Sequence, residues 1–189
     1  MPVNYFNKFP KIEYKFDENH DGNITKKMMT DLTVKFKLSD VAITTKNAFY
    51  PYTWRPGDRV DSLAYNYYDN STFYWLVMLS NEKFDPIHDF PMDTNIFEKY
   101  LFKKYGKESG QESFESVIEY TYQTIHEYRD SDGDVIDYET YHNTPESIAV
   151  SIYDYEFEKN EEKRDIRLIS DNLSSRIQTE LEKKLNDVK

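Results

Sequence analysis

Cysteine is absent from this 189-residue chain, which excludes a disulfide framework, thiol catalysis and zinc sites with cysteine ligands. Glycine is scarce, and no glycine-rich loop of the kind that cradles phosphates is present. The longest apolar run covers only residues 75–79, far short of the roughly 20 residues that cross a bilayer. The N-terminal residues lack a basic stretch followed by an apolar one, so we expect no secretory signal and synthesis in a cytoplasm.

Candidate catalytic groups are also sparse. The histidines lie far apart in the sequence and show no metal-ligand spacing; they are His20, His88, His126 and His142. No serine lies in a Gly-x-Ser-x-Gly elbow. Pairs of Asp and Glu occur throughout an acidic chain, so they carry no specific signal for glycoside hydrolysis. We therefore predict that the protein is not an enzyme and uses no cofactor.

Two acidic loops have some of the features of a cation site. Residues 17–28 match an EF-hand loop at its first positions and at its glycine, but the position of the bidentate Glu holds Met28, and Pro10 interrupts any preceding helix. The three aspartates of residues 130–134 are spaced like ligands, but Val135 occupies the position that needs glycine. We expect an exposed turn at both loops and no metal site.

Charge is spread unevenly along the chain. The net charge is -11, from 24 Lys and Arg against 35 Asp and Glu. Residues 106–189 hold 10 of the basic and 21 of the acidic side chains, which accounts for the whole excess. Such a surface cannot bind nucleic acid by counterion release, and an anionic membrane would repel it. We expect the partners to be proteins or a neutral polymer such as a glycan.

Aromatic residues are abundant, with 17 Tyr and 12 Phe in a chain that is only 38% hydrophobic. A disordered acidic chain would be poor in aromatics, so this composition favours a folded protein. Tyr is common in strands and also at protein interfaces, and both uses fit this sequence. The excess of Tyr favours a protein with interfaces to other subunits.

Residues 1–40 are predicted to form an N-terminal arm with little core of its own. Its aromatic residues are mixed with prolines and lysines and show no helical period. A short strand is expected at 32–38, where apolar and polar residues alternate. Aromatics on an arm need a surface to pack on, which is either the next domain or a partner protein. Tyr5, Phe6 and Phe9 are therefore candidate subunit contacts.

Residues 41–105 are predicted to hold the main core and a following helix. The expected elements are a strand at 50–54, a turn at 55–58, a helix at 60–68, capping residues at 69–72, a second helix at 73–80, an extended piece from 84 and a third helix at 94–105. Asp58 is expected to cap the first helix, and Asp93, Thr94 or Asn95 the third. Gly106 should end the third helix, so we place a boundary there.

Residues 111–142 are predicted to form a β-hairpin. Apolar and polar residues alternate over 118–128, which predicts its first strand. The Asp-Gly pair within 130–134 is typical of a hairpin turn, and 136–138 would return as the second strand. Residues 147–158 fit either a further strand or a helix.

The C-terminal segment is predicted to be a short apolar strand at 166–169, followed by a helix that begins at Ser170 and Asp171. This helix carries an apolar stripe at i, i+4 spacing, made of Leu173, Ile177, Leu181 and Leu185. A stripe of this kind needs a partner surface. Leu173, Ile177 and Leu181 therefore join the arm residues as candidate subunit contacts.

Residues 52–68, with Asn81 closing the second helix, resemble a LysM module. The residues that carry the likeness are Gly57, Asp58, Leu63, Ala64, Trp75 and Asn81. LysM modules bind glycans that contain N-acetylglucosamine, so the resemblance implies peptidoglycan binding as an alternative function.

A closer likeness covers nearly the whole chain and is loosest over 106–160. The residues that carry it are Tyr5-Phe6, Phe9-Pro10, Ile12 with Tyr14, Met29-Thr30-Asp31-Leu32, the LysM-like core with Phe73-Tyr74-Trp75 and Asn81, Phe84-Asp85-Pro86, and 163–169. In this order and spacing they resemble the LysM-containing baseplate wedge proteins of contractile-tailed, T4-like bacteriophages.

This resemblance implies an α+β fold, with a small LysM-like β-α-α-β core, an extended N-terminal arm, and a C-terminal β-hairpin plus terminal helix. It implies a structural subunit that joins wedge proteins and neighbouring wedges around the central hub of the tail baseplate. Assembly would take place in the host cytoplasm, and the protein would remain in the virion. The expected partners are other wedge and inner-baseplate proteins, with no nucleic acid or membrane, and the LysM-like fold would dock proteins rather than bind glycans.

Overall fold

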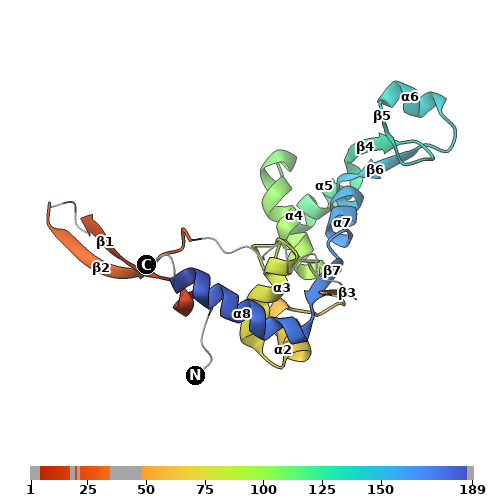
Figure 1. Cartoon of the computed structure of the whole chain (residues 1–189). Coiled ribbons are helices and arrows are strands. Elements are labelled where there is room, and N and C mark those ends of the chain that lie inside the picture. The colour runs from red at the N-terminus through yellow and green to blue at the C-terminus, as the bar shows by residue number, and fades with distance from the viewer. Residues whose placement is uncertain (1–4, 18–19, 21, 35–47, 187–189) are drawn as a thin grey trace. The chain divides into compact units, whose positions relative to one another are not determined.

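The chain combines helices with small antiparallel sheets, so the fold is α+β as predicted (Figure 1). The computed structural model describes residues 5–17, 20, 22–34 and 48–186. The chain divides into two compact units. Unit 1 comprises residues 1–53, 58–86 and 166–189, and unit 2 comprises 54–57 and 87–165.

Each unit combines helices with short strands. The elements of unit 1 are η1 (Tyr5–Lys8), β1 (Lys11–Asp17), β2 (Ile24–Thr30), β3 (Phe49–Thr53), α2 (Val60–Tyr68), η2 (Ser71–Phe73), α3 (Tyr74–Ser80), β7 (Asp165–Ile169) and α8 (Asp171–Asn186). The elements of unit 2 are α4 (Thr94–Ser109), α5 (Phe114–Gln123), β4 (Ile125–Arg129), β5 (Val135–Ile136), α6 (Tyr138–Asn143), β6 (Ile148–Ser151) and α7 (Ile152–Glu161).

The two units group these elements differently from the sequence ranges 1–40, 41–105 and 106–189. Helix α4, expected beside the core, lies in unit 2. Helix α8 and all of β7 but its first residue lie in unit 1, although they follow the acidic region in sequence. Unit 1 is thus assembled from segments far apart in the chain.

Strands β1 and β2 form an antiparallel hairpin in the N-terminal arm. Their register runs from Lys11 opposite Thr30 to Asp17 opposite Ile24. The strand expected at 32–38 is not confirmed, because 32–34 are irregular backbone and 35–38 lie outside the described residues. The alternation of charged and apolar residues over 11–17 is the signal that identifies the strand that does form.

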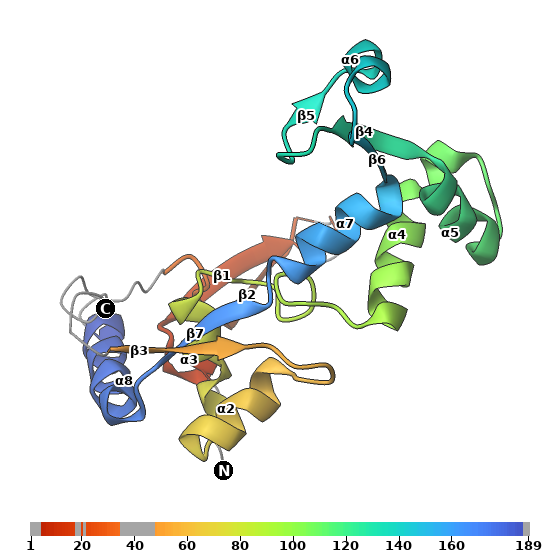
Figure 2. The ribbon, with the colours of Figure 1, turned by 90° about the vertical axis from the view of Figure 1, so that its right-hand side faces the viewer.

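Strand β3 pairs with β7, and the segment 87–164 lies between α3 and β7 in sequence (Figure 2). Hydrogen bonds flank the pair, from the backbone N–H of Ser170 to the carbonyl of Ala48 and from that of Trp54 to the carbonyl of Arg164, both at 2.8 Å. From Ala48 to Trp54 the chain advances along β3, while the bonded residues on the other strand run back from Ser170 to Arg164, so the pair is antiparallel. The expected extended piece from residue 84 is therefore not the strand that completes this sheet.

Helices α2 and α3 form where they were expected. Asp58 does not cap α2, because the N-cap position is Arg59 and the Asp58 carboxylate accepts a hydrogen bond from the Tyr52 hydroxyl at 2.7 Å. Asn70 lies in the predicted capping segment and accepts a hydrogen bond from the N–H of Thr72 at 3.0 Å, where η2 begins. Local capping thus places η2, which leads directly into α3, whereas the N-cap residues of α2 and α3 make no capping hydrogen bond with their side chains.

Helix α4 begins as predicted and ends later than predicted. The Asp93 carboxylate caps it by accepting a hydrogen bond from the N–H of Ile96 at 3.0 Å. Gly106 lies inside the helix and does not end it, while Gly110, with a φ of 66°, is the C-cap. A glycine inside a helix costs only about 1 kcal/mol, which packing can offset. The end of α4 is thus marked by the left-handed backbone conformation of Gly110 and not by the presence of a glycine alone.

The predicted hairpin of residues 111–142 is shorter than expected. Residues 114–123 form α5 instead of a strand, since Val117 and Thr121 lie one turn apart and are both buried. The hairpin consists of β4 and β5 around the predicted turn, where the Asp130 carboxylate accepts hydrogen bonds from the N–H groups of Asp132 and Asp134. Tyr138, expected in the second strand, begins α6.

Residues 147–158 combine both predicted possibilities, with β6 leading directly into α7. The Ser151 hydroxyl caps α7 by accepting a hydrogen bond from the N–H of Asp154 at 3.1 Å. The sheet order is β5-β4-β6, and β4 and β6 are antiparallel. The core of unit 2 gathers Met92, Phe97, Leu101, Tyr105, Val117 and Ile152. The predicted β7 and α8 are confirmed, and no described helix is long and apolar enough to cross a membrane.

Candidate protein-interaction site

The β1–β2 hairpin has one mainly apolar and one mainly charged face. Because side chains alternate across a strand and opposed residues share a face, one face, which we call the aromatic face, holds Ile12, Tyr14 and Phe16 of β1 with Thr25, Lys27 and Met29 of β2. The exposed fractions of Ile12, Tyr14 and Met29 are 42%, 51% and 45%, and only Phe16 is half-buried. The rings of Tyr14 and Phe16 stack with centroids 6.0 Å apart. Such a face is suited to bind another protein surface.

The base of the hairpin is connected to the rest of unit 1 through the segment that contains η1. Lys8 forms an ion pair of 2.6 Å with Glu182 on α8. Phe9 is buried, while Phe6 is 43% exposed and its ring lies 5.8 Å from that of Phe9. Of the three arm residues predicted as contacts, Phe6 is therefore accessible and Phe9 is an anchor. The side chain of Tyr5 lies outside the described residues.

The stripe of α8 lies mostly inside the chain. Ile177, Leu181 and Leu185 are buried, and Leu173 is half-buried. The partner surface that the stripe requires is therefore supplied by this chain, and its burial does not require a second subunit. The interface role predicted for Leu173, Ile177 and Leu181 stays a prediction.

Three of the six LysM-like residues lie in the core of unit 1. Leu63, Ala64 and Trp75 are buried on α2 and α3. Tyr68, which sequence reasoning did not single out, donates a hydrogen bond from its hydroxyl to the carbonyl of Ile169 at 2.9 Å, and burial raises the pKa of this phenol. Gly57 has a φ of 84° in the turn before α2, a conformation that favours glycine.

Asn81 links the end of α3 to strand β7. Its side-chain amide donates to the carbonyl of Arg167 at 2.9 Å, and its oxygen accepts from the N–H of Arg167 at 2.9 Å. The neighbouring Ser80 hydroxyl, which is buried, contacts the same carbonyl at 3.0 Å. Asn81 therefore pairs with the backbone of β7 as a strand would.

Asn160 makes the same arrangement in unit 2, which the sequence did not reveal. Its amide donates to the carbonyl of Met92 at 3.0 Å, and its oxygen accepts from the N–H of Met92 at 2.8 Å. The side chain is 2% exposed. This amide clamp, as we call it, connects α7 to the segment before α4.

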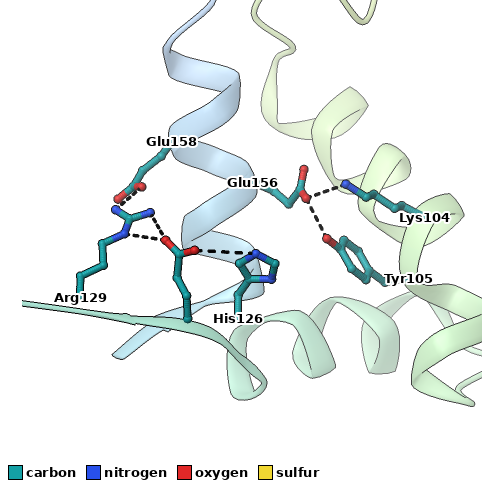
Figure 3. Close-up of polar contacts among 7 residues, drawn as sticks. Lys104, Tyr105, His126, Arg129, Glu156 and Glu158 are labelled. Carbon is teal, nitrogen blue, oxygen red and sulfur yellow. Dashed lines mark hydrogen bonds and ion pairs between the residues drawn. The ribbon is translucent and has the colours of Figure 1, made fainter. Parts of the chain in front are cut away.

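Glu156 is a buried carboxylate at the centre of a second connection between α7 and α4 (Figure 3). It accepts hydrogen bonds from Lys104 and Tyr105, both at 2.7 Å, and from Tyr100 at 3.2 Å. Burial would raise the pKa of the Glu156 carboxyl, but the hydrogen bonds from Lys104 and Tyr105 outweigh burial and lower it. Burial and the bond to Glu156 raise the pKa of Tyr105 to about 12. The carboxylate is thus held ionised and fully bonded.

A surface network joins β4 to α7 beside this cluster (Figure 3). Arg129 forms ion pairs with Glu127 at 2.6 Å and with Glu158 at 2.7 Å. The ring centroids of His126 and Tyr155 lie 3.8 Å apart. In the described part of the chain, no group of three or more His, Asp or Glu side chains is placed to hold a metal ion. These polar groups connect secondary-structure elements to one another.

Charge follows the division into units. Unit 2 contains nine Lys or Arg against 20 Asp or Glu, whereas unit 1 contains 15 of each. Unit 2 therefore carries the entire net charge of the chain, and unit 1 is neutral. The hairpin and the acidic surface thus belong to different units.

A family model supplies the identification. The model described as Base plate wedge protein 53, a phage family, matches residues 4–183, which include all of unit 2 and nearly all of unit 1. The chain belongs to this family. The resemblance to phage baseplate wedge proteins is thereby confirmed, and the protein is a structural component of the tail baseplate of the virion. No curated protein sequence matches the chain significantly.

Proposed function

We propose that the protein is a docking subunit that joins wedge proteins, and neighbouring wedges, around the central hub of a contractile-tail baseplate during assembly in the host cytoplasm. The observation that carries this proposal is the exposed aromatic face of β1–β2 in a chain of the baseplate wedge family. An isolated two-stranded hairpin is at best marginally stable in water. A partner surface that covers Ile12, Tyr14 and Met29 would supply the missing burial.

The polar interior supports a structural role rather than an enzymatic one. Glu156, Asn81 and Asn160 each use their polar atoms on partners within the chain. Their pairing fixes α7 against α4 in unit 2 and β7 against α3 in unit 1. A rigid unit that presents a docking element needs such connections and needs no reactive group.

We further propose that β3, α2, α3 and β7 form a LysM-like β-α-α-β core that residues 87–164 interrupt before its last strand. The order of elements and the pairing of β3 with β7 support this reading. In this reading the core is a protein-docking platform, and its partners are other wedge and inner-baseplate proteins.

Peptidoglycan binding is the alternative function, and the hydrogen bonds of Asn81 make it less favourable. A glycan would need free hydrogen-bonding groups near this residue, but both atoms of its amide are used on the backbone of Arg167. We expect the purified protein not to be retained by insoluble peptidoglycan. Retention that soluble N-acetylglucosamine oligomers release would favour the alternative.

Size-exclusion chromatography with light scattering tests the proposal. The full chain is measured alone and then mixed with the other baseplate wedge proteins of the same phage. We expect a shift into a larger complex only in the mixture. A chain that elutes unchanged with every wedge protein would contradict the docking role.

A further inference from the structure

We propose that the charged face of the β1–β2 hairpin binds carboxylates on an acidic surface of a neighbouring baseplate protein, an inference that rests on the proposed docking role. This face is opposite the aromatic face and holds Lys11, Glu13, Lys15 and Asp17 of β1 with Ile24, Lys26, Met28 and Thr30 of β2. It is therefore a second surface of the same element.

The register places two lysines directly opposite each other. Lys15 on β1 pairs with Lys26 on β2, and both side chains are exposed. Like charges directly opposite in an antiparallel pair destabilise the sheet. The free hairpin thus carries an electrostatic cost that a carboxylate above the pair would remove.

The neighbouring acidic groups compensate this pair only in part. Glu13 forms an ion pair with Lys26 at 3.2 Å, and the Asp17 carboxylate accepts a hydrogen bond from the N–H of Gly22 at 2.8 Å. Lys11 donates to the hydroxyl of Thr30 at 2.6 Å, so it is held near the end of the hairpin. Within the described ranges, no carboxylate lies within ion-pair distance of Lys15. A partner carboxylate is the group that completes this face.

One feature favours a protein over a nucleic acid as the partner. The opposite face of the hairpin is mainly apolar, with Ile12, Tyr14 and Met29 exposed beside Lys27, and it needs an apolar surface that a phosphate backbone does not offer. The partner surface we infer is apolar where it meets Tyr14 and carries Asp or Glu where it meets Lys15.

The substitution Lys15→Glu separates this inference from simple stabilisation of the hairpin. It replaces the like-charged pair with an opposite pair, so the free hairpin should become more ordered. It also presents a negative charge to an acidic partner. Hydrogen exchange of the β1 and β2 amides measures the order of the free hairpin. Titration of the full chain with the purified wedge proteins of the same phage measures binding to the partner.

We expect slower amide exchange in Lys15→Glu together with binding at least about tenfold weaker, since like charges across an interface disfavour association strongly. The wild-type affinity should fall as salt rises, and that dependence should flatten in the variant. Lys99→Glu, an exposed position on α4 with the same change of charge, is the matched control and should bind as the wild type does.

Four outcomes would overturn the inference. Binding by Lys15→Glu within twofold of wild type would show that no carboxylate meets this face. Equal weakening by Lys99→Glu would show a general charge effect. Binding of wild type to random-sequence double-stranded DNA that Lys15→Glu abolishes would identify a nucleic acid instead. If the wild type binds no wedge protein at all, the proposed docking role fails, and this inference fails with it.

Discussion

The amide clamp at Asn160 yields a prediction whose sign depends on pH. In Asn160→Asp the side chain keeps its shape, so one carboxyl oxygen can still accept from the N–H of Met92. The other oxygen replaces the amide nitrogen, which in the wild type donates to the carbonyl oxygen of Met92 at 3.0 Å. In the variant, two oxygens face each other across this distance. An ionised carboxylate there places two acceptors against each other in a site that is 2% exposed.

The magnitude follows from the groups left without partners. A buried carbonyl that loses its donor costs about 1–3 kcal/mol. Burial of the charge adds to this, and the carboxyl responds by binding a proton, so its folded-state pKa rises above the unfolded value of about 3.9. We expect Asn160→Asp to lose about 3 kcal/mol of unfolding free energy at pH 7.

The loss should largely disappear in acid. A carboxyl whose pKa is higher in the folded state binds its proton more tightly there. The free energy of unfolding that this binding adds is fully present below the unfolded pKa and is lost as pH rises through the folded pKa. In the Asn160→Asp variant, the protonated carboxyl would donate from its hydroxyl to the Met92 carbonyl and restore the clamp. The deficit relative to wild type should therefore be small near pH 4 and full at pH 7.

Urea unfolding followed by circular dichroism at several pH values measures this deficit. Asn95→Asp is the matched control, because Asn95 is exposed in the first turn of α4, where an acidic side chain favours the helix by about 0.3–1 kcal/mol. A deficit in Asn160→Asp that is equal at pH 4 and pH 7, or no deficit at pH 7, would refute the reasoning from the clamp.

Three further predictions concern the stripe, the buried carboxylate and the aromatic face. Ile177→Asp should destabilise the protein by more than about 3 kcal/mol in thermal unfolding, because it buries an unpaired charge; a fully stable variant that fails to assemble would instead identify an interface residue. Glu156→Gln should cost about 2 kcal/mol at pH 7. Folding lowers the pKa of Glu156, so its contribution to the free energy of unfolding is present above the unfolded pKa of about 4.3 and is lost as pH falls through the folded pKa. Urea unfolding should therefore show the deficit of the variant shrinking in acid. A deficit that stays constant with pH would contradict this. Tyr14→Ser should leave the melting temperature within a few degrees of wild type and weaken binding to the wedge proteins in the titration above, whereas Tyr65→Ser, at an exposed tyrosine of α2, should change neither.

The candidate site was only partly accessible from the sequence. The arm and its aromatics were recognised, and Phe6 proved accessible. The hairpin itself was missed, although the alternation over 11–17 signals β1, because its partner β2 lacks a clean period of two. Pairing between β1 and β2 decides which side chains share a face, so the aromatic face emerges only from the register.

Features set by neighbouring residues could be predicted from the sequence. The helices over 60–68 and 74–80 follow from apolar periodicity. The start of α4 at Asp93 and the turn at 130–134 follow from carboxylates that accept hydrogen bonds from backbone N–H groups within a few residues. Charge and composition likewise pointed to protein partners, and the order of short motifs indicated the family that the match over 4–183 confirms.

Only the tertiary structure decided what depends on contacts between distant segments. The alternation over 118–128 predicts a strand, but burial of Val117 and Thr121 selects a helix for its first part, so this prediction was wrong there. The pairing of β3 with β7 joins distant parts of the chain, and the side chains of Asn81 and Asn160 bond to residues 86 and 68 positions away. Local sequence carries no signal for such bonds, because the free energy that fixes them comes from burying both partners together.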